Sequence, residues 1–119
     1  MARPKNRESL EEELKQAIDK AFARRALEGE NISILCLPSD GRLHSLMLEL
    51  SIDGRDEDQN GRGVKKKWKR YIGNHADKML RALFGAIKRF RVSHRNCPTV
   101  KVAASYANFG VRRYREDYV

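Results

Sequence analysis

The sequence predicts a small single-domain α+β protein in which two helices pack on one face of an antiparallel sheet. The prediction rests on the spacing of apolar residues, which changes along the chain. Apolar residues recur every three or four positions over 9–28 and 64–90, as on one side of an amphipathic helix. Over 31–37, 42–52 and 99–106 they crowd together or alternate, as in strands. The predicted order is α-β-β-α-β, or α-β-β-α-β-β if the C-terminal tail forms a fourth strand.

The chain has 119 residues, of which 40% are hydrophobic, and this suits one domain with a modest core. We expect residues 1–8 to be disordered and residues 9–119 to form the domain. The longest apolar runs are far shorter than the roughly 20 residues needed to span a bilayer. The N-terminal segment also lacks the apolar core of a signal peptide. We therefore expect no membrane partner and an intracellular location, cytoplasmic or, in a eukaryote or virus, nuclear.

The first predicted helix has clear signals at both ends. Ser9 and Glu12 form a capping-box pattern, in which the two side chains satisfy backbone amides of the first turn. Arg24 and Arg25 lie near the negative end of the helix dipole, where cations are favoured, and Gly29 is a suitable terminator. The stripe expected to face the core comprises Leu10, Leu14, Ala17, Ile18, Ala21 and Phe22.

The next two predicted strands, 31–37 and 42–52, form a hairpin. The residues between them, 38–41, are Pro, Ser, Asp and Gly, which favour turns. A helix over 43–52 is the alternative because Leu, Met and Glu favour helices, but strict alternation favours the strand. His44 begins the apolar face, and we expect it at a partly exposed strand end rather than in a metal or catalytic site.

Residues 53–63 contain three glycines, four acids and no large apolar side chain. This composition predicts a mobile, solvated loop. The acids lack the alternating ligands and the closing glutamate of an EF-hand, so we predict no metal site there.

The second predicted helix has an apolar stripe that includes Trp68, which is therefore expected in the core. The stripe keeps its phase through Gly73, which is consistent with one continuous helix. A break at Gly73 is the alternative, because the segment from Asn74 to Asp77 is a capping-type pattern. The sequence leaves both open.

The opposite face of this helix is strongly basic. Residues 59–95 contain twelve Lys and Arg against Asp77 alone, a net charge of +11, whereas residues 7–58 carry a net −6. Solvated helices usually intersperse acids with bases because such pairs stabilise them. A face that lacks these pairs is typical of a surface that meets a polyanion. The alternative is that the acidic first helix neutralises this face within the fold.

The C-terminal tail follows a third predicted strand, 99–106, and a break at 108–110. In the tail, three arginines are interleaved with two tyrosines. Aromatic rings among arginines can stack nucleobases and hold phosphates. The same pattern suits a last edge strand or a docked tail.

No enzyme or metal motif appears in the sequence. Cys36 and Cys97 lie outside any C-x-x-C pair, so we expect reduced, partly buried thiols. A nuclease-like activity of His75, Asp77 or His94 would suit a basic cleft, but no spacing supports it. We expect no catalysis, no cofactor and no bound metal.

The sequence therefore predicts a non-enzymatic protein that binds nucleic acid, DNA or RNA, through contacts to the phosphate backbone. A homodimer is compatible with this function because a two-fold axis would double the basic strip. The alternative is a protein adaptor or inhibitor that docks the same helix on an acidic surface of a larger complex. The candidate binding residues are Lys65, Lys66, Lys67, Lys69, Arg70, Lys78, Arg81, Lys88 and Arg89 on the helix and Arg112, Arg113, Tyr114 and Arg115 in the tail.

Overall fold

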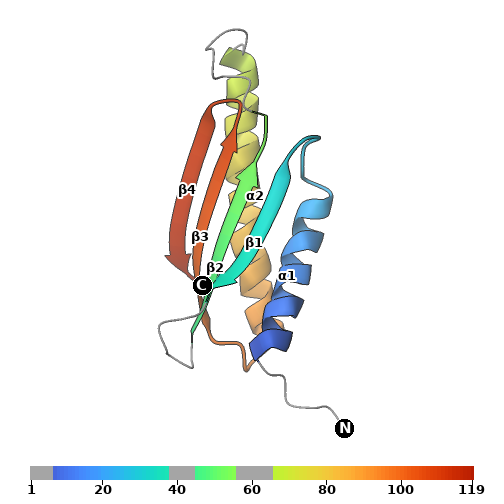
Figure 1. The fold of residues 1–119 in the computed structure, drawn as a ribbon, viewed down its shortest axis with the longest axis vertical. Helices are drawn as coiled ribbons and strands as arrows, with labels where there is room; N and C mark the ends of the chain where they lie inside the picture. Colours follow the sequence, from blue (N-terminus) through green and yellow to red (C-terminus); the bar gives the residue numbers. More distant parts are fainter. Residues whose placement is uncertain (1–6, 38–44, 56–65) are drawn as a thin grey trace.

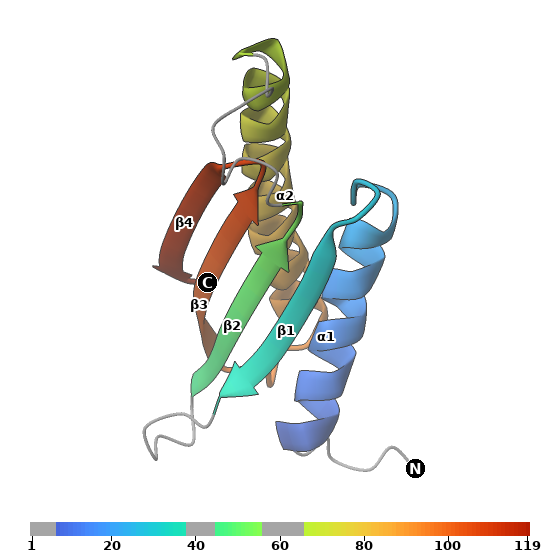
Figure 2. The same cartoon turned by 45° about the horizontal axis from the view of Figure 1, so that its top comes forward.

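The computed structural model describes residues 7–37, 45–55 and 66–119, which form two helices and one four-stranded sheet. The elements are α1 (Arg7–Ala23), β1 (Asn31–Leu37), β2 (Ser45–Asp53), α2 (Lys66–Ser93), β3 (Thr99–Asn108) and β4 (Val111–Tyr118). Both helices lie on the same side of the sheet (Figure 1, Figure 2). The predicted α+β class and order are confirmed, and the tail forms the fourth strand.

The sheet is mixed rather than antiparallel. Its strands follow the order β1-β2-β3-β4, with antiparallel pairs at both edges and a parallel pair between β2 and β3. The prediction of an antiparallel sheet is therefore wrong at the central pair. α2 is the physical reason, because it returns along the sheet from the end of β2 and brings β3 in beside β2 in the same direction. The predicted hairpin is confirmed, with Ile34 of β1 opposite Leu50 of β2.

One hydrophobic core lies between the sheet and the two helices. Alternate residues of β2 and β3 point into it, as the period of two in a strand requires. Its fully buried side chains include Leu14, Ile18 and Phe22 from α1, Leu50 and Ile52 from β2, Ile72, Met79, Leu83 and Ile87 from α2, and Val100, Val102 and Tyr106 from β3. The apolar stripes of both predicted helices thus face the sheet.

α2 is one continuous helix of 28 residues that passes through Gly73 without a break. At 1.5 Å per residue it is about 42 Å long, whereas β3 spans about 33 Å. The helix is therefore longer than the sheet that it covers, and residues 66–71 at its start are all exposed. Figure 1 shows this end of α2 rising beyond the strands. Trp68 lies on the projecting end, so the prediction that it is a core residue is wrong.

α1 begins at Arg7 and ends at Ala23, earlier than the predicted helix of 9–28 at both ends. The backbone amide of Leu27 donates a hydrogen bond to the Glu30 carboxylate at 2.7 Å instead of to a carbonyl one turn back. Gly29, with a φ of 87°, then turns the chain toward β1. The helix ends earlier than predicted because the Leu27 amide, which would donate to a helix carbonyl in a longer helix, donates to Glu30 instead.

The predicted loop at 53–63 lies mostly outside the described residues, as do His44 and the turn at 38–41. The predicted start at Asp53 is wrong by one residue, because Asp53 belongs to β2, whereas Gly54 and Arg55 lie outside any strand. Asp53 ends β2 opposite Ala107, and the Gly54 amide donates to the Ala107 carbonyl at 2.8 Å. Pairing with β3 carries the chain past the predicted boundary.

Candidate functional site

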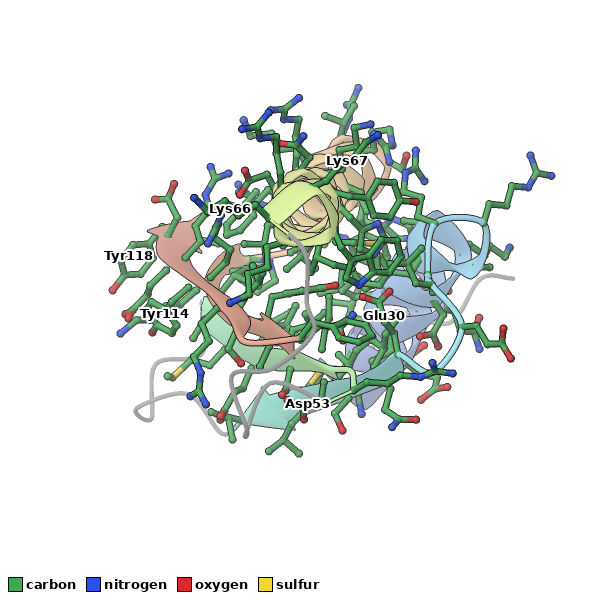
Figure 3. All side chains as sticks on the ribbon, turned by 90° about the horizontal axis from the view of Figure 1, so that it is seen from above. Glu30, Asp53, Lys66, Lys67, Tyr114 and Tyr118 are labelled. Atoms are coloured by element: carbon green, nitrogen blue, oxygen red, sulfur yellow. The ribbon has the colours of Figure 1, made fainter. Side chains whose placement is uncertain are left out.

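The exposed face of α2 carries most of the cations that the sequence singled out as candidates. A subset of them comprises Lys67, Arg70, Lys78, Arg81, Lys88 and Arg89, which are all exposed. Within the part of the chain that the structure describes, none of this subset forms an ion pair. Figure 3 looks along α2 and shows Lys67 pointing away from the sheet. Lys66 and Lys69 are also exposed, and Lys65 lies outside the described residues.

A groove of about 550 Å³ lies where the segment after α1 approaches the middle of α2. Ala82 and Gly85 are the small residues on its α2 side, and they leave room between larger side chains. Four cations and one histidine complete its lining, namely Arg25, His75, Lys78, Arg81 and Arg89. The α2 members share one side of the helix because they are three or four residues apart. The groove is therefore a concave, strongly basic extension of the exposed face.

The antiparallel packing of α1 and α2 decides where the charges of α1 lie (Figure 2). The acidic start of α1 lies near the end of α2, where Glu13 pairs with His94 at 3.1 Å. The basic end of α1 lies near the middle of α2, where Arg25 lines the groove. Lys20, Arg24 and Arg25 also line a separate hollow of about 710 Å³ at the end of α1. Among the described residues, no acid of α1 forms an ion pair with the subset of six exposed cations on α2.

Lys20, Arg24 and Arg25 are not among the candidate binding residues that the sequence predicts. The adjacent arginines at the end of the predicted helix were a usable signal. Their place at the end of a helix is equally explained by the helix dipole, and the antiparallel packing that brings Arg25 beside α2 has no signature in the sequence.

Two of the tail arginines face α2 from β4. Arg113 Nε lies 3.3 Å from Asp77 Oδ1, which makes an exposed ion pair. The guanidinium of Arg115 lies over the ring of Phe84, 4.0 Å from its centroid, in a cation–π contact. These two arginines flank α2 on the side away from the groove.

The other two tail candidates, Arg112 and Tyr114, lie on the outer face of the sheet, because neighbouring residues of a strand point to opposite faces. The Tyr114 hydroxyl donates to Glu116 Oε2 at 2.7 Å. This hydrogen bond raises the pKa of Tyr114 and lowers the pKa of Glu116. The structure therefore does not bring the whole tail onto the surface of the basic helix.

A buried carboxylate, Glu30, lies behind the groove, between the helices and the sheet (Figure 3). Its side chain is fully buried, its Oε1 lies 2.9 Å from His75 Nε2, and it accepts a hydrogen bond from the Tyr106 hydroxyl. Asn108 Nδ2 donates in turn to the Tyr106 hydroxyl at 3.2 Å. Burial, and then the hydrogen bond to Glu30, raise the pKa of Tyr106 well above its usual range. This network holds His75 in the wall of the groove.

The three residues considered for nuclease-like chemistry are not brought together. His75 pairs with Glu30, whereas Asp77 pairs with Arg113 on the other flank of α2. His94 lies beyond the end of α2, where its ring stacks on Phe90 with centroids 4.0 Å apart. No group of three or more His, Cys, Asp or Glu side chains in the described ranges could hold a metal ion.

The two cysteines are thiols that no disulfide joins, as predicted. Cys97 is buried, and this burial raises the pKa of its thiol.

Over the same described ranges, no helix is both long enough and apolar enough to cross a membrane.

The projecting end of α2 carries an aromatic cluster. The rings of Trp68 and Tyr71 stack with centroids 5.0 Å apart, and Phe109 of the β3–β4 turn meets Trp68 edge-on at 5.8 Å. Trp68 is 41% exposed and Tyr71 is 50% exposed. The sequence does not predict this cluster, because a helical period identifies the side of a helix that faces the sheet but not where the sheet ends.

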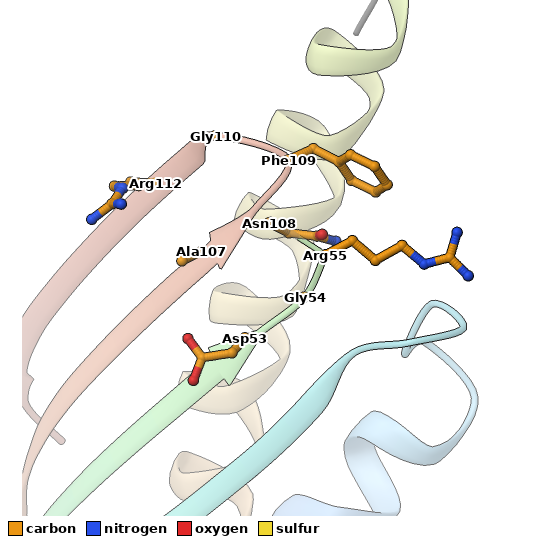
Figure 4. Close-up of a pocket in the computed structure, with 8 residues that line it drawn as sticks. All are labelled: Asp53, Gly54, Arg55, Ala107, Asn108, Phe109, Gly110 and Arg112. Carbon is orange, nitrogen blue, oxygen red and sulfur yellow. The ribbon is translucent and has the colours of Figure 1, made fainter. Parts of the chain in front are cut away.

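A pocket of about 350 Å³ opens beside Phe109, between the end of β2 and the β3–β4 turn (Figure 4). Arg55 and Arg112 lie on opposite sides of it, and the Arg55 side chain extends toward the connection between α1 and β1. Asn108 Oδ1 is buried there and has no hydrogen-bond partner within the described ranges. This pocket lies at the same end of the molecule as the aromatic cluster.

Comparison with protein-family models, with curated proteins and with solved structures gives no significant match to this chain.

Proposed function

We propose that this protein binds nucleic acid through the exposed basic face of α2 and the groove between α2 and the end of α1. One observation carries the proposal. Six exposed cations of this face have no ion-pair partner among the described residues, although an acidic helix packs directly against α2. They are Lys67, Arg70, Lys78, Arg81, Lys88 and Arg89.

Such a face is unfavourable on its own. Like charges one helical turn apart destabilise a helix by a few tenths of a kcal/mol per pair, and this helix has few opposite charges to offset them. Phosphate groups would relieve the repulsion. Lys and Arg side chains would replace counterions condensed on the nucleic-acid backbone, and the release of those ions would drive binding.

The proposed surface combines segments that are distant in the sequence. Arg24 and Arg25 extend it at the end of α1, and the groove provides a concave site with cations on several sides. Arg113 and Arg115 flank α2 on β4, each already engaged by Asp77 or Phe84. Arg112 and Tyr114 lie on the opposite face of the sheet and are not part of the proposed surface.

The salt dependence of binding tests the proposal. Fluorescence anisotropy with labelled DNA and RNA oligonucleotides should show affinity that falls with salt. If four to six phosphates are contacted, the slope of log K against log salt should be about −3 to −5. The absence of binding at low salt, or a flat response, would contradict the proposal. Stronger binding to polyglutamate than to either nucleic acid would favour the protein-adaptor alternative.

A further inference from the structure

We infer that the nucleic acid bound at this surface is single-stranded, and that its unpaired bases stack on Trp68 and Tyr71. This inference rests on the proposed function and adds the class of strand to it. Its starting point is the exposure of two large rings on a helix whose other aromatic side chains, Phe84 and Phe90, are buried.

The two rings form an ordered platform. Their planes are only 16° apart, with centroids at 5.0 Å, so the pair presents nearly parallel flat surfaces. Phe109 supports Trp68 from the side at an angle of 81°. Rings that are already held in place lose little conformational freedom when a ligand binds. A nucleobase suits this platform because every base has a flat π-face that can stack on an aromatic ring.

The cations around the platform indicate which ligand would occupy it. Lys67 and Arg70 are exposed beside the rings in the first turns of α2. Tyr71, His75 and Lys78 step by four and three residues along one side of the helix, and this side continues as the basic groove. A strand whose bases lie on the rings could therefore place its phosphates on these cations. An apolar protein segment would match the rings but would leave the charges unmatched.

The dimensions suit a short stretch of single strand. Position 71 to position 89 spans about 27 Å along the helix axis. Sites of single-strand binding domains cover about 4–16 nucleotides, so a stretch of this length falls within their usual scale. A duplex keeps its base faces inside its own stack, so it could use the cations but not the rings.

Trp68 is the only tryptophan in the chain, so its fluorescence reports directly on stacking. We would titrate the protein with single-stranded oligothymidylate, with a blunt duplex of the same length, and with polyphosphate, which has charge but no bases. We expect strong quenching by the single strand, weak quenching by the other two, and affinity for the single strand about tenfold above that for the duplex.

Variants separate stacking from charge. Trp68→Ala and Tyr71→Ala should each weaken single-strand binding about tenfold, with Trp68→Phe less affected, and should leave duplex binding within about twofold. Tyr114→Ala is the matched control, because this tyrosine is also exposed but lies on the outer face of the sheet. Equal affinity for single strand and duplex, with Trp68→Ala neutral, would overturn this inference and leave the proposed function standing. Binding of neither nucleic acid would overturn the proposed function itself.

Discussion

Arg113 on β4 forms an ion pair with Asp77 on α2, with Arg113 Nε 3.3 Å from Asp77 Oδ1. Asp77 is the only acid in the basic stretch of residues 59–95. Its partner comes from β4, and Asp77 is not among the residues that line the groove. The Asp77 carboxylate therefore pairs with Arg113 and not with Arg25, Lys78 or the other cations of the groove. Those cations remain available to bind an anionic ligand.

The end of α1 should contribute to binding. Changing Arg24 and Arg25 to Gln should weaken nucleic-acid binding several-fold. It should also reduce the magnitude of the slope of log K against log salt by about 1–2, because each lost phosphate contact means that about one counterion fewer is released on binding. The fold should persist, since both side chains are exposed and, within the described part of the chain, Arg25 alone donates a side-chain hydrogen bond, to the Ala21 carbonyl at 2.6 Å. Binding titrations over a salt series measure this.

The matched control for this change is Arg95 and Arg112 to Gln. It removes the same charge from a turn beyond α2 and from the outer face of the sheet. An unchanged salt slope in the Arg24 and Arg25 variant, or an equal loss in the control, would mean that the end of α1 is not part of the surface.

Two glycines should respond in opposite ways to alanine. A Cβ at Gly73 would lie 2.9 Å from Arg113 Nη2, the mobile end of an exposed side chain. Gly73 lies inside a continuous helix, where alanine is favoured by about 0.5–1 kcal/mol, so Gly73→Ala should be neutral or stabilising. A Cβ at Gly54 would lie 2.1 Å from Asn108 Oδ1, which is buried and held by the Tyr106 network. Gly54→Ala should therefore destabilise by about 1–3 kcal/mol.

Urea denaturation of both glycine variants measures the difference. A loss of more than about 1 kcal/mol in Gly73→Ala would indicate a helix break at this residue rather than a continuous helix.

The buried hydroxyl of Tyr106 should make stability depend on alkaline pH. Its pKa is raised in the folded state, so its contribution is fully present below the ordinary tyrosine pKa of about 10 and is lost as the pH rises above that value. Tyr106→Phe should lower the free energy of unfolding by about 1–3 kcal/mol near neutral pH, because Glu30 and Asn108 each lose a hydrogen-bond partner. The variant should then lose less stability than the wild type on going to about pH 11.

Denaturation at the two pH values tests this, with Tyr118→Phe as the control at an exposed tyrosine. Parallel pH profiles for the wild type and Tyr106→Phe would show that the buried hydroxyl has no such role.

Local patterns predicted much of the fold. The stripe from Leu10 to Phe22, the alternation around Leu48 and Leu50, and the stripe from Ile72 to Ile87 reflect the burial of one face of each element, so they identify elements and their inner sides. The parallel pairing of β2 with β3 was not predictable in the same way. It depends on where a long helix returns the chain, and no residue of either strand carries a signal for it.

The candidate site was predicted only in part. The exposed cations of α2 follow from the helical period, and the structure places them on one face as expected. The helical period places Trp68 in the apolar stripe and so predicts it in the core, but the sheet does not extend as far along α2 as Trp68. The sequence does not predict Arg25 as a site residue, because its neighbours in space, His75 and Lys78, come from another helix.

A comparison of two double variants tests the central claim most directly. Lys78 and Arg81 to Gln, and Arg95 and Arg112 to Gln, both reduce the net charge by two, but only the first pair lies on the proposed surface. We expect the first variant to melt within a few degrees of the wild type and to bind a labelled oligonucleotide about tenfold more weakly or worse, while the second stays within about twofold. Equal losses in the two variants would contradict the account, because they would show that binding depends on total charge rather than on the face of α2.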